Sequence, residues 1–168
     1  GERTSQVSGS SLPSATLIAS GQYHDLALRT DGTVWTWGRN HKGQIGDGTT
    51  VDRASPGEVE HLSNVVAIGA GAEHTCAVDV RGDAFCWGRN TESQLGAGDT
   101  PGPSTLPGEV KFSGTAAPGA TSSGFVAITA GVAHTCGLRS SGRAMCWGSA
   151  AFGQIGDGGS TTRNTPQG

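Results

Sequence analysis

The stretch Gly21-Gln-Tyr-His24, followed by Trp37-Gly38 and Gly43-Gln-Ile-Gly46, is the first of three copies of one pattern in this chain of 168 residues. The second copy reads Gly71-Ala-Glu-His74, Trp87-Gly88 and Gln94-Leu-Gly96, and the third reads Gly131-Val-Ala-His134, Trp147-Gly148 and Gly153-Gln-Ile-Gly156. The step from His to Trp is always 13 residues and the step from Trp to Gln always 7, whereas successive copies are 50 and 60 residues apart. A fixed internal register with variable spacers is typical of repeat architectures, and such long periods indicate a propeller or an array.

One copy read alone predicts short antiparallel strands. In the second copy Val65–Ile68 is a β-rich run, and His74–Asp79 and Ala84–Trp87 are two strand-like runs around a turn at Gly82. The first copy has Asp31-Gly32 at this turn, which is a strong hairpin signal. No segment shows a sustained helical period, so we expect an all-β chain.

These units fit the blades of a β-propeller made of repeated four-stranded antiparallel blades. We expect about three blades, at residues 15–64, 65–124 and 125–168, with a Pro-containing spacer after each hairpin and a long spacer at 100–124. Residues 1–14 are interpreted as an N-terminal extension or a strand that completes a blade. A single blade cannot bury both of its faces, so we expect the chain to belong to a larger chain or to an oligomer.

Composition argues against several classes of protein. The net charge is -3 and the hydrophobic content 34%, so the chain lacks the basic footprint of a nucleic-acid-binding protein. No apolar run approaches the roughly 18 residues that a membrane span needs. The chain opens without an initiator Met or an apolar signal core, which suggests a removed leader or a piece of something larger.

Four cysteines occupy equivalent positions in the second and third copies: Cys76, Cys86, Cys136 and Cys146. Four cysteines allow three pairings. The hairpin register favours the local pairing within each copy, because opposed residues of a non-hydrogen-bonded pair lie close enough for a disulfide. That register also brings Asp79 near Asp83, which weighs against it, and the alternative is four reduced, buried thiols. Two disulfides would indicate an extracytoplasmic location, in the periplasm, at the cell surface or outside the cell.

The pattern Gly-x-x-His-(Thr)-(Cys), then Trp-Gly, then Gln-Leu/Ile-Gly resembles the repeats of the regulator of chromosome condensation family, from about Ala15 to the C-terminus. The resemblance implies a propeller with four-stranded blades, of which three are too few to close a ring. The cysteine-bearing version is similar to the bacterial, exported branch of the family. The family's founding nuclear member has a basic N-terminal tail and acts on a small GTPase, but this chain shows no basic tail.

Three residue types recur in every copy, and we interpret them as structural. They are His24, His74 and His134; Trp37, Trp87 and Trp147; and Gln44, Gln94 and Gln154. The tryptophans should pack between blades, the glutamines should satisfy backbone groups of their loops, and each histidine should bond backbone within its own blade. The alternatives are a metal held by the three histidines and a sugar bound by the glutamines. We expect no catalytic residue, metal or other cofactor.

These observations favour a non-enzymatic structural or protein-interaction module that presents loops on a rigid scaffold. Open blade faces predict a protein partner or self-association. One alternative, by fold analogy alone, is a guanine-nucleotide-exchange regulator of a small GTPase. Another is a glycan-binding propeller or an enzyme. The spacer at 100–124 is the least repeated part of the chain, and we expect it to be its most individual surface.

Overall fold

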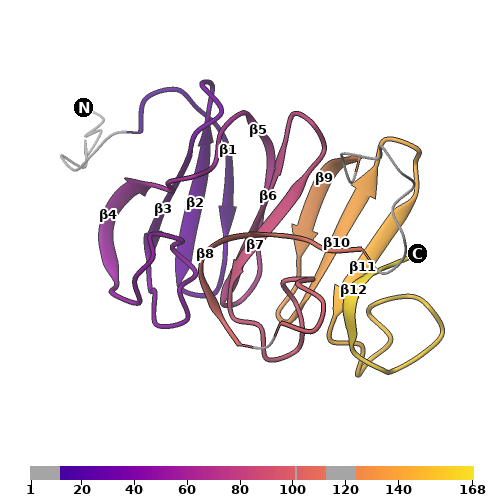
Figure 1. Ribbon diagram of the computed structural model, residues 1–168. Coiled ribbons are helices and arrows are strands. Elements are labelled where there is room, and N and C mark those ends of the chain that lie inside the picture. Colours follow the sequence, from indigo (N-terminus) through magenta and orange to yellow (C-terminus); the bar gives the residue numbers. More distant parts are fainter. Residues whose placement is uncertain (1–11, 101, 113–123) are drawn as a thin grey trace, which may run out of the picture.

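The chain is described by a computed structural model that covers residues 12–100, 102–112 and 124–168 (Figure 1). Within these residues it forms twelve β-strands and no helix, and so no helix capable of crossing a membrane. The strands form three four-stranded antiparallel sheets, each in simple sequential order. The predicted all-β fold of four-stranded propeller blades is therefore confirmed.

Each blade uses four successive strands. The first blade contains β1 (Ala15–Ser20), β2 (His24–Arg29), β3 (Val34–Gly38) and β4 (Arg53–Glu58). The second contains β5 (Val65–Ala70), β6 (His74–Asp79), β7 (Ala84–Gly88) and β8 (Ser104–Glu109). The third contains β9 (Phe125–Ala130), β10 (His134–Arg139), β11 (Ala144–Gly148) and β12 (Arg163–Gln167).

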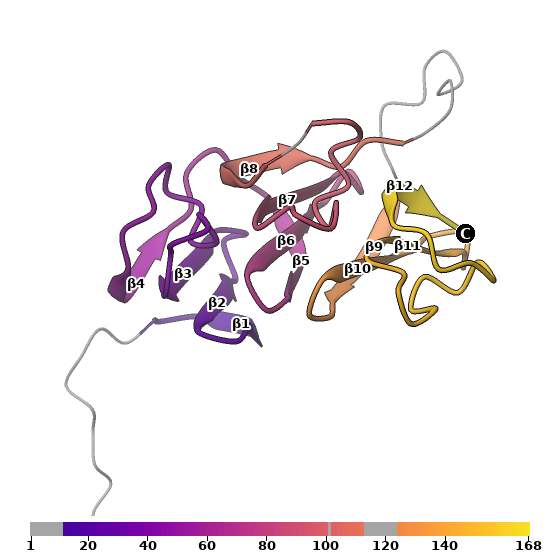
Figure 2. The ribbon, with the colours of Figure 1, turned by 90° about the horizontal axis from the view of Figure 1, so that it is seen from below.

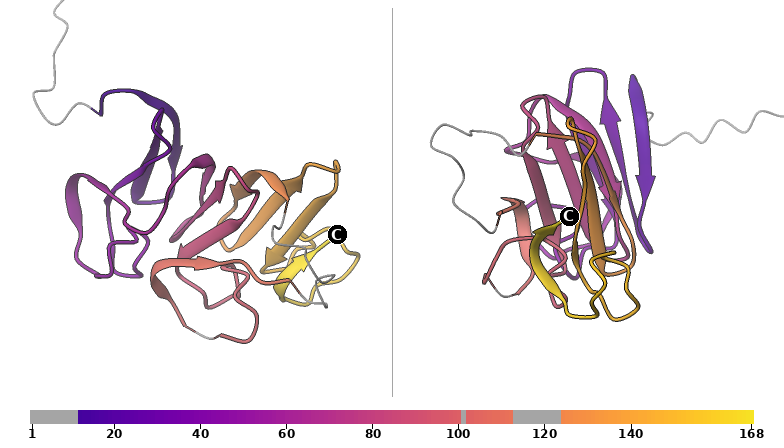
Figure 3. Two further views of the ribbon diagram at one scale, coloured as in Figure 1. Left: turned by 45° about the horizontal axis from the view of Figure 1, so that its top comes forward. Right: turned by 90° about the vertical axis from the view of Figure 1, so that its right-hand side faces the viewer.

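The three blades stand side by side as part of an arc. Figure 2 shows the first strands β1, β5 and β9 toward the inner side of the arc and the fourth strands β4, β8 and β12 toward the outer side. The second blade lies between the other two in the left-hand view of Figure 3, and β5 contacts both β1 and β9. One face of the first blade and one face of the third are therefore the ends of this arc.

The fourth strands lie in the segments predicted to be Pro-containing spacers. Each contains a proline, namely Pro56, Pro107 and Pro166. Proline cannot donate to a ladder, but it is tolerated on an edge strand, and the fourth strand is the outer edge of its blade. Strand β8 thus occupies part of the expected spacer at 100–124. Residues 113–123 of that spacer, and residues 1–11 of the expected N-terminal extension, lie outside the described residues.

The hairpin register opposes the two cysteines of each pair. Cys76 pairs with Cys86 and Cys136 with Cys146, at Cα separations of 4.2 and 4.1 Å, and each pair forms a disulfide. The like charges that weighed against this register are bridged. The guanidinium of Arg81 lies 2.9 Å from an oxygen of Asp79 and 3.4 Å from one of Asp83.

Apolar side chains fill the space between successive blades. The first junction is built mainly from Leu26, Leu28, Val34, Val65, Ala77 and Trp87. The second is built mainly from Cys76, Val78, Ala84, Cys86, Phe125, Ile128, Met145 and Trp147. The core therefore lies between the sheets, so that each blade depends on its neighbours for burial of its faces.

The two disulfides differ in exposure, and this predicts an order of reduction. Cys76 and Cys86 are 0% and 1% exposed at the second junction. Cys136 and Cys146 are only partly buried, because they lie on the face of the third blade that no other blade of the described chain covers. Thiol–disulfide exchange requires access of the attacking thiolate to sulfur. We expect dithiothreitol to reduce Cys136–Cys146 first in the folded chain, as measured by timed alkylation, digestion and mass spectrometry.

The urea-unfolded chain is the control for this measurement, because both disulfides are then equally accessible and should be reduced at similar rates. Equal rates of reduction in the folded chain would contradict the expectation.

Candidate functional site

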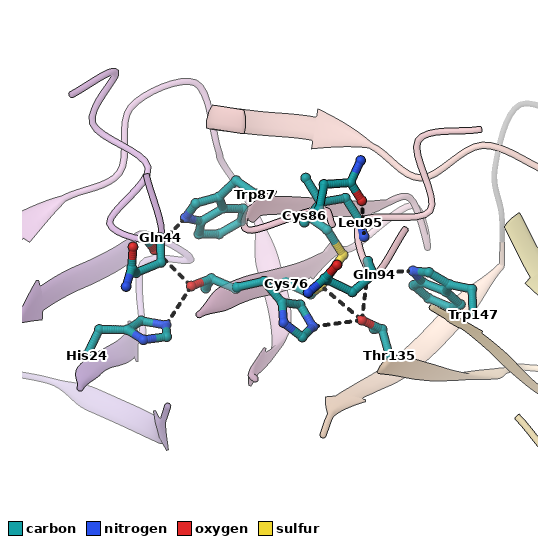
Figure 4. Close-up of a disulfide and its surroundings, with 12 residues drawn as sticks. His24, Gln44, Cys76, Cys86, Trp87, Gln94, Leu95, Thr135 and Trp147 are labelled. Atoms are coloured by element: carbon teal, nitrogen blue, oxygen red, sulfur yellow. Dashed lines mark hydrogen bonds between the residues drawn. A yellow bond between two sulfur atoms is a disulfide. The ribbon is translucent and has the colours of Figure 1, made fainter. Parts of the chain in front are cut away.

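At the first junction one main-chain carbonyl joins two blades. The carbonyl of Gln44 accepts a hydrogen bond from Thr75 Oγ1 at 2.8 Å and a second from Trp87 Nε1 at 2.9 Å. The second junction repeats both bonds at the same lengths, with Gln94, Thr135 and Trp147 (Figure 4). Both lone pairs of each carbonyl are thereby used by side chains of the following blade.

A histidine of the preceding blade completes each arrangement. His24 Nε2 lies 2.9 Å from Thr75 Oγ1, and His74 Nε2 lies 2.9 Å from Thr135 Oγ1. The threonine hydrogen is already donated to the carbonyl, so the ring must carry its hydrogen on Nε2 and donate to the hydroxyl. We call this set of His, Thr, Gln carbonyl and Trp the junction relay. The histidines were expected to bond backbone in their own blade; the structure instead directs Nε2 of both across the junction.

Burial keeps these two histidines neutral. Loss of solvation lowers the pKa of His24 from 6.5 to about 4 and that of His74 to about 3. The Nδ1 atoms of both rings are buried without a hydrogen-bond partner, so protonation there would leave an unpaired donor. His134, at the open face of the third blade, is less buried and has a pKa lowered by the same cause.

The glutamine side chains shape the turn that presents the carbonyl. Each Oε1 atom accepts a hydrogen bond from the main-chain nitrogen two residues earlier, as Gln44 does from Lys42, Gln94 from Glu92 and Gln154 from Phe152. The glycine that ends the turn lies against the indole of the next blade. A Cβ on Gly46 would lie 2.6 Å from Trp87 Nε1, and the residue has a φ of +81°, so glycine is required there.

The repeat residues at the two ends of the arc are less buried. Trp87 and Trp147 are fully buried, but Trp37 in the first blade is only partly buried because no blade precedes it in the described chain. His134 and Gln154 in the third blade are likewise only partly buried. The three histidines do not share a binding site, because His24 bonds Thr75 and His74 bonds Thr135. In the part of the chain that the structure describes, no group of three or more His, Cys, Asp or Glu could hold a metal ion.

The junction threonines were not singled out from sequence. The signal was present, since His-Thr occurs at residues 74–75 and 134–135, but the first copy has Asp25 at this position. The need for a hydroxyl becomes clear only from the preceding blade. The threonine oxygen accepts a hydrogen bond from the histidine of that blade and donates one to the glutamine carbonyl of the same blade.

One end of the blades carries the turns between the first and second strands and the loops between the third and fourth. We call it the loop end; it comprises residues 21–23, 39–52, 71–73, 89–100, 131–133 and 149–162. Equivalent positions there carry different chemistry. Tyr23 lies under the guanidinium of Arg39 at 5.3 Å, whereas Glu73, at the equivalent position, lies 2.9 Å from His41 and 3.0 Å from Arg89.

In the third blade two exposed apolar side chains lie at the loop end. Val132 is 73% exposed and Phe152 is 95% exposed. Tyr23 in the first blade is also exposed, at 56%. The three copies of one scaffold thus carry different groups at the loop end. The first has a cation–π pair at Tyr23, the second an ion-pair cluster around Glu73, and the third the exposed ring of Phe152.

Removing one hydroxyl of the relay should weaken folding. The change Thr135→Val leaves the Nε2–H of His74 buried without an acceptor, which costs about 1–3 kcal/mol of the free energy of unfolding. Urea unfolding measures this loss. The matched control is Thr129→Val on the adjacent strand, where the side chain is exposed and should change stability little. Equal effects of the two substitutions would exclude a role for the relay in stability.

The buried histidines also predict a pH dependence of stability. Their folded-state pKa values, about 4 and about 3, lie below the value of about 6.5 expected in the unfolded chain. Between about pH 6.5 and about pH 4 the unfolded state binds more protons, so stability falls as pH falls through this window, by up to about 1.4 kcal/mol per pH unit for each histidine.

Urea unfolding at about pH 7 and about pH 4.5 measures this loss. The variant His74→Gln retains a side-chain N–H donor but does not titrate, so it should lose less stability than the parent chain between these two pH values. An unchanged difference between the two pH values would contradict the assignment to His74.

Comparison with known proteins gives the family. The model of the regulator of chromosome condensation (RCC1) repeat matches residues 31–78 and 81–138, and a second model of this repeat matches 15–44, 65–94 and 125–154. The human protein RCC2 is 46% identical over 43 residues, which are 26% of this chain and 8% of that protein. The chain therefore corresponds to a small part of that relative.

Two solved structures are similar over most of this chain. Human WBSCR16 aligns with a TM-score of 0.76 at 23% identity, over 99% of this chain and 39% of that one. Prp20p of Saccharomyces cerevisiae aligns with a TM-score of 0.75 at 25% identity, over 91% of this chain and 37% of that one. The repeat matches cover more than half of the residues, so this chain belongs to the RCC1 repeat family.

Proposed function

We propose that this chain is a non-enzymatic protein-interaction module, a set of exported propeller blades that binds another protein through its loop end. The observation that carries the proposal is the contrast between a repeated scaffold and unrepeated exposed side chains. The junction relay has the same bond lengths at both junctions. Loops on such a fixed scaffold are the usual carriers of recognition.

The exposed side chains at the loop end are of the types that dominate protein interfaces. Tyrosine, tryptophan and arginine are enriched among the residues that contribute most to binding, and aromatic rings bury a large area on contact. Tyr23 with Arg39, and the fully exposed ring of Phe152, provide such groups at the two ends of the arc.

The extracytoplasmic location rests on the two disulfides, because such bonds persist in oxidising compartments and are rare in the cytosol. Yeast RCC1 (Prp20) is bound to Kap60 in one solved structure, and another solved structure of Prp20p was reported with its binding properties to Gsp1p and histones. These partners belong to those proteins, but they support the class of function proposed here, the binding of another protein.

The test is affinity capture from the extracytoplasmic fraction of the source cells with three forms of the chain. We expect a protein retained by the parent chain to be lost, or weakened about thirtyfold in affinity, with Tyr23→Ser and Phe152→Ser combined, which corresponds to about 2 kcal/mol. The matched control combines Val66→Ser and Val80→Ser, two exposed apolar residues away from the loop end. Retention of the partner by the loop variant, or its equal loss with the control, would reject the loop end as the binding surface.

A further inference from the structure

One carboxylate at the loop end joins two loops that belong to different blades. Glu73 lies in the turn between β5 and β6, and its side chain is only 15% exposed. Its Oε1 atom lies 2.9 Å from Nε2 of His41, in the loop of the first blade, and its Oε2 atom lies 3.0 Å from Nη1 of Arg89. Arg89 in turn donates from Nε to the hydroxyl of Thr91 at 2.7 Å, in the loop of the second blade. The two oxygens of Glu73 thus serve the two loops separately.

These contacts act on the turns that present the relay carbonyls, residues 40–46 and 90–96, which we call the relay turns. His41 lies three residues before Gln44, and Thr91 lies three residues before Gln94. A displacement of either turn would move a carbonyl that has to stay within hydrogen-bond distance of a hydroxyl and an indole. Glu73 therefore lies where it couples the position of one relay turn to that of the other.

The link is not part of the repeated scaffold. At the second junction the positions equivalent to His41, Glu73 and Arg89 are occupied by Thr91, Ala133 and Ser149. None of these three side chains is charged, so among the described residues the link is made at the first junction alone. It is an individual feature of the loop end, where the copies differ most.

The contacts of Glu73 differ from an isolated ion pair at a surface. Exposed pairs contribute little to stability, because water and salt screen the charges and two long side chains must be ordered. Here the carboxylate is largely desolvated, and both of its oxygens are occupied. A carboxylate only accepts hydrogen bonds, so His41 and Arg89 both depend on it as donors. Loss of this one group would release both relay turns.

We propose that Glu73 is a positioning residue that holds the loops 39–52 and 89–100 in one preformed arrangement. A surface that is ordered before it binds loses less conformational entropy when the partner arrives. The inference rests on the function proposed above for its role in binding. The coupling of the two loops is a property of the chain alone, so its test needs no partner.

Hydrogen–deuterium exchange with mass spectrometry measures this coupling in the 168-residue chain. The main-chain N–H groups of Ile45 and Leu95 are buried, and each donates to an asparagine side chain five residues earlier, so they exchange only when a relay turn opens. Glu73→Gln keeps the shape of the side chain but replaces one acceptor by a donor. The matched control is Glu92→Gln, which removes a glutamate charge from the same end; its side chain makes no hydrogen bond or ion pair in the part of the chain that the structure describes.

We expect Glu73→Gln to speed exchange about tenfold in both relay turns and to leave the strand amides unchanged, because hydrogen bonds to a charged group are lost on both sides. His41→Ala is a second variant. It should speed exchange in the turn at Leu95 as well as in its own loop, although His41 belongs to the other blade. Adding His41→Glu to Glu73→Gln places an acceptor opposite the new amide donor and should restore slow exchange in both turns.

Exchange that stays slow in both relay turns of a folded Glu73→Gln would overturn the proposal. A change confined to one turn, an equal effect of Glu92→Gln, or equally faster exchange in all strands would overturn it as well. If Glu73→Gln does not fold, His41→Ala is judged by the same criteria. Failure to capture a partner through the loop end would not alter these exchange rates, so the two proposals fail separately.

Discussion

A main-chain carbonyl that accepts two side-chain hydrogen bonds from the next blade is the contact on which the remaining structure depends. The carbonyl groups of Gln44 and Gln94 lie in loops, where a buried acceptor without partners would cost more than a typical hydrogen bond contributes. Each is satisfied by a hydroxyl and an indole of the following sheet. The loop carbonyl therefore depends on the neighbouring blade for its hydrogen-bond donors, and the indole of that blade depends on the loop for its acceptor. This mutual requirement explains why His, Trp and Gln keep a fixed spacing while the segments between copies vary in length.

The apolar packing around this contact is less constrained, and the two junctions fill similar space in different ways. In the second blade Val65 packs at a junction that also contains Ala77. The third blade has Phe125 at the equivalent position of Val65 and Gly137 at that of Ala77. A Cβ on Gly137 would lie 2.5 Å from the ring of Phe125, so the larger ring occupies the space that the missing methyl leaves. Cores accept such compensated exchanges of volume far more readily than they accept an unpaired buried polar group. The polar relay therefore repeats without change, while the apolar residues beside it do not.

The sequence was sufficient to predict those features that depend on local spacing. The all-β fold, the hairpins around Gly32 and Gly82 and the division into repeated blades follow from periodicity and turn chemistry. Four strands in each blade were expected, but the positions of the fourth strands did not emerge, because Pro56 and Pro107 lower the strand signal and only an edge position makes them acceptable. The partner of each histidine did not emerge either. His24 and Thr75 are 51 residues apart, and nothing in the intervening sequence indicates that their side chains meet across two sheets.

The first blade shows why a disulfide can be present in the second and third copies and absent from the first. At the position of Cys86 the first blade has Thr36, whose hydroxyl donates to the carbonyl of Ile45 at 2.7 Å. That hydrogen bond ties the third strand to the loop that carries Gln44, whereas a disulfide ties it to the second strand. Opposite Thr36, Leu26 is fully buried in the first junction and contributes the apolar contact that a cystine makes at the second. Both solutions leave the Gln carbonyl and its two donors unchanged. The disulfides are therefore a covalent addition that suits an oxidising compartment, and the relay holds the blades together with or without them.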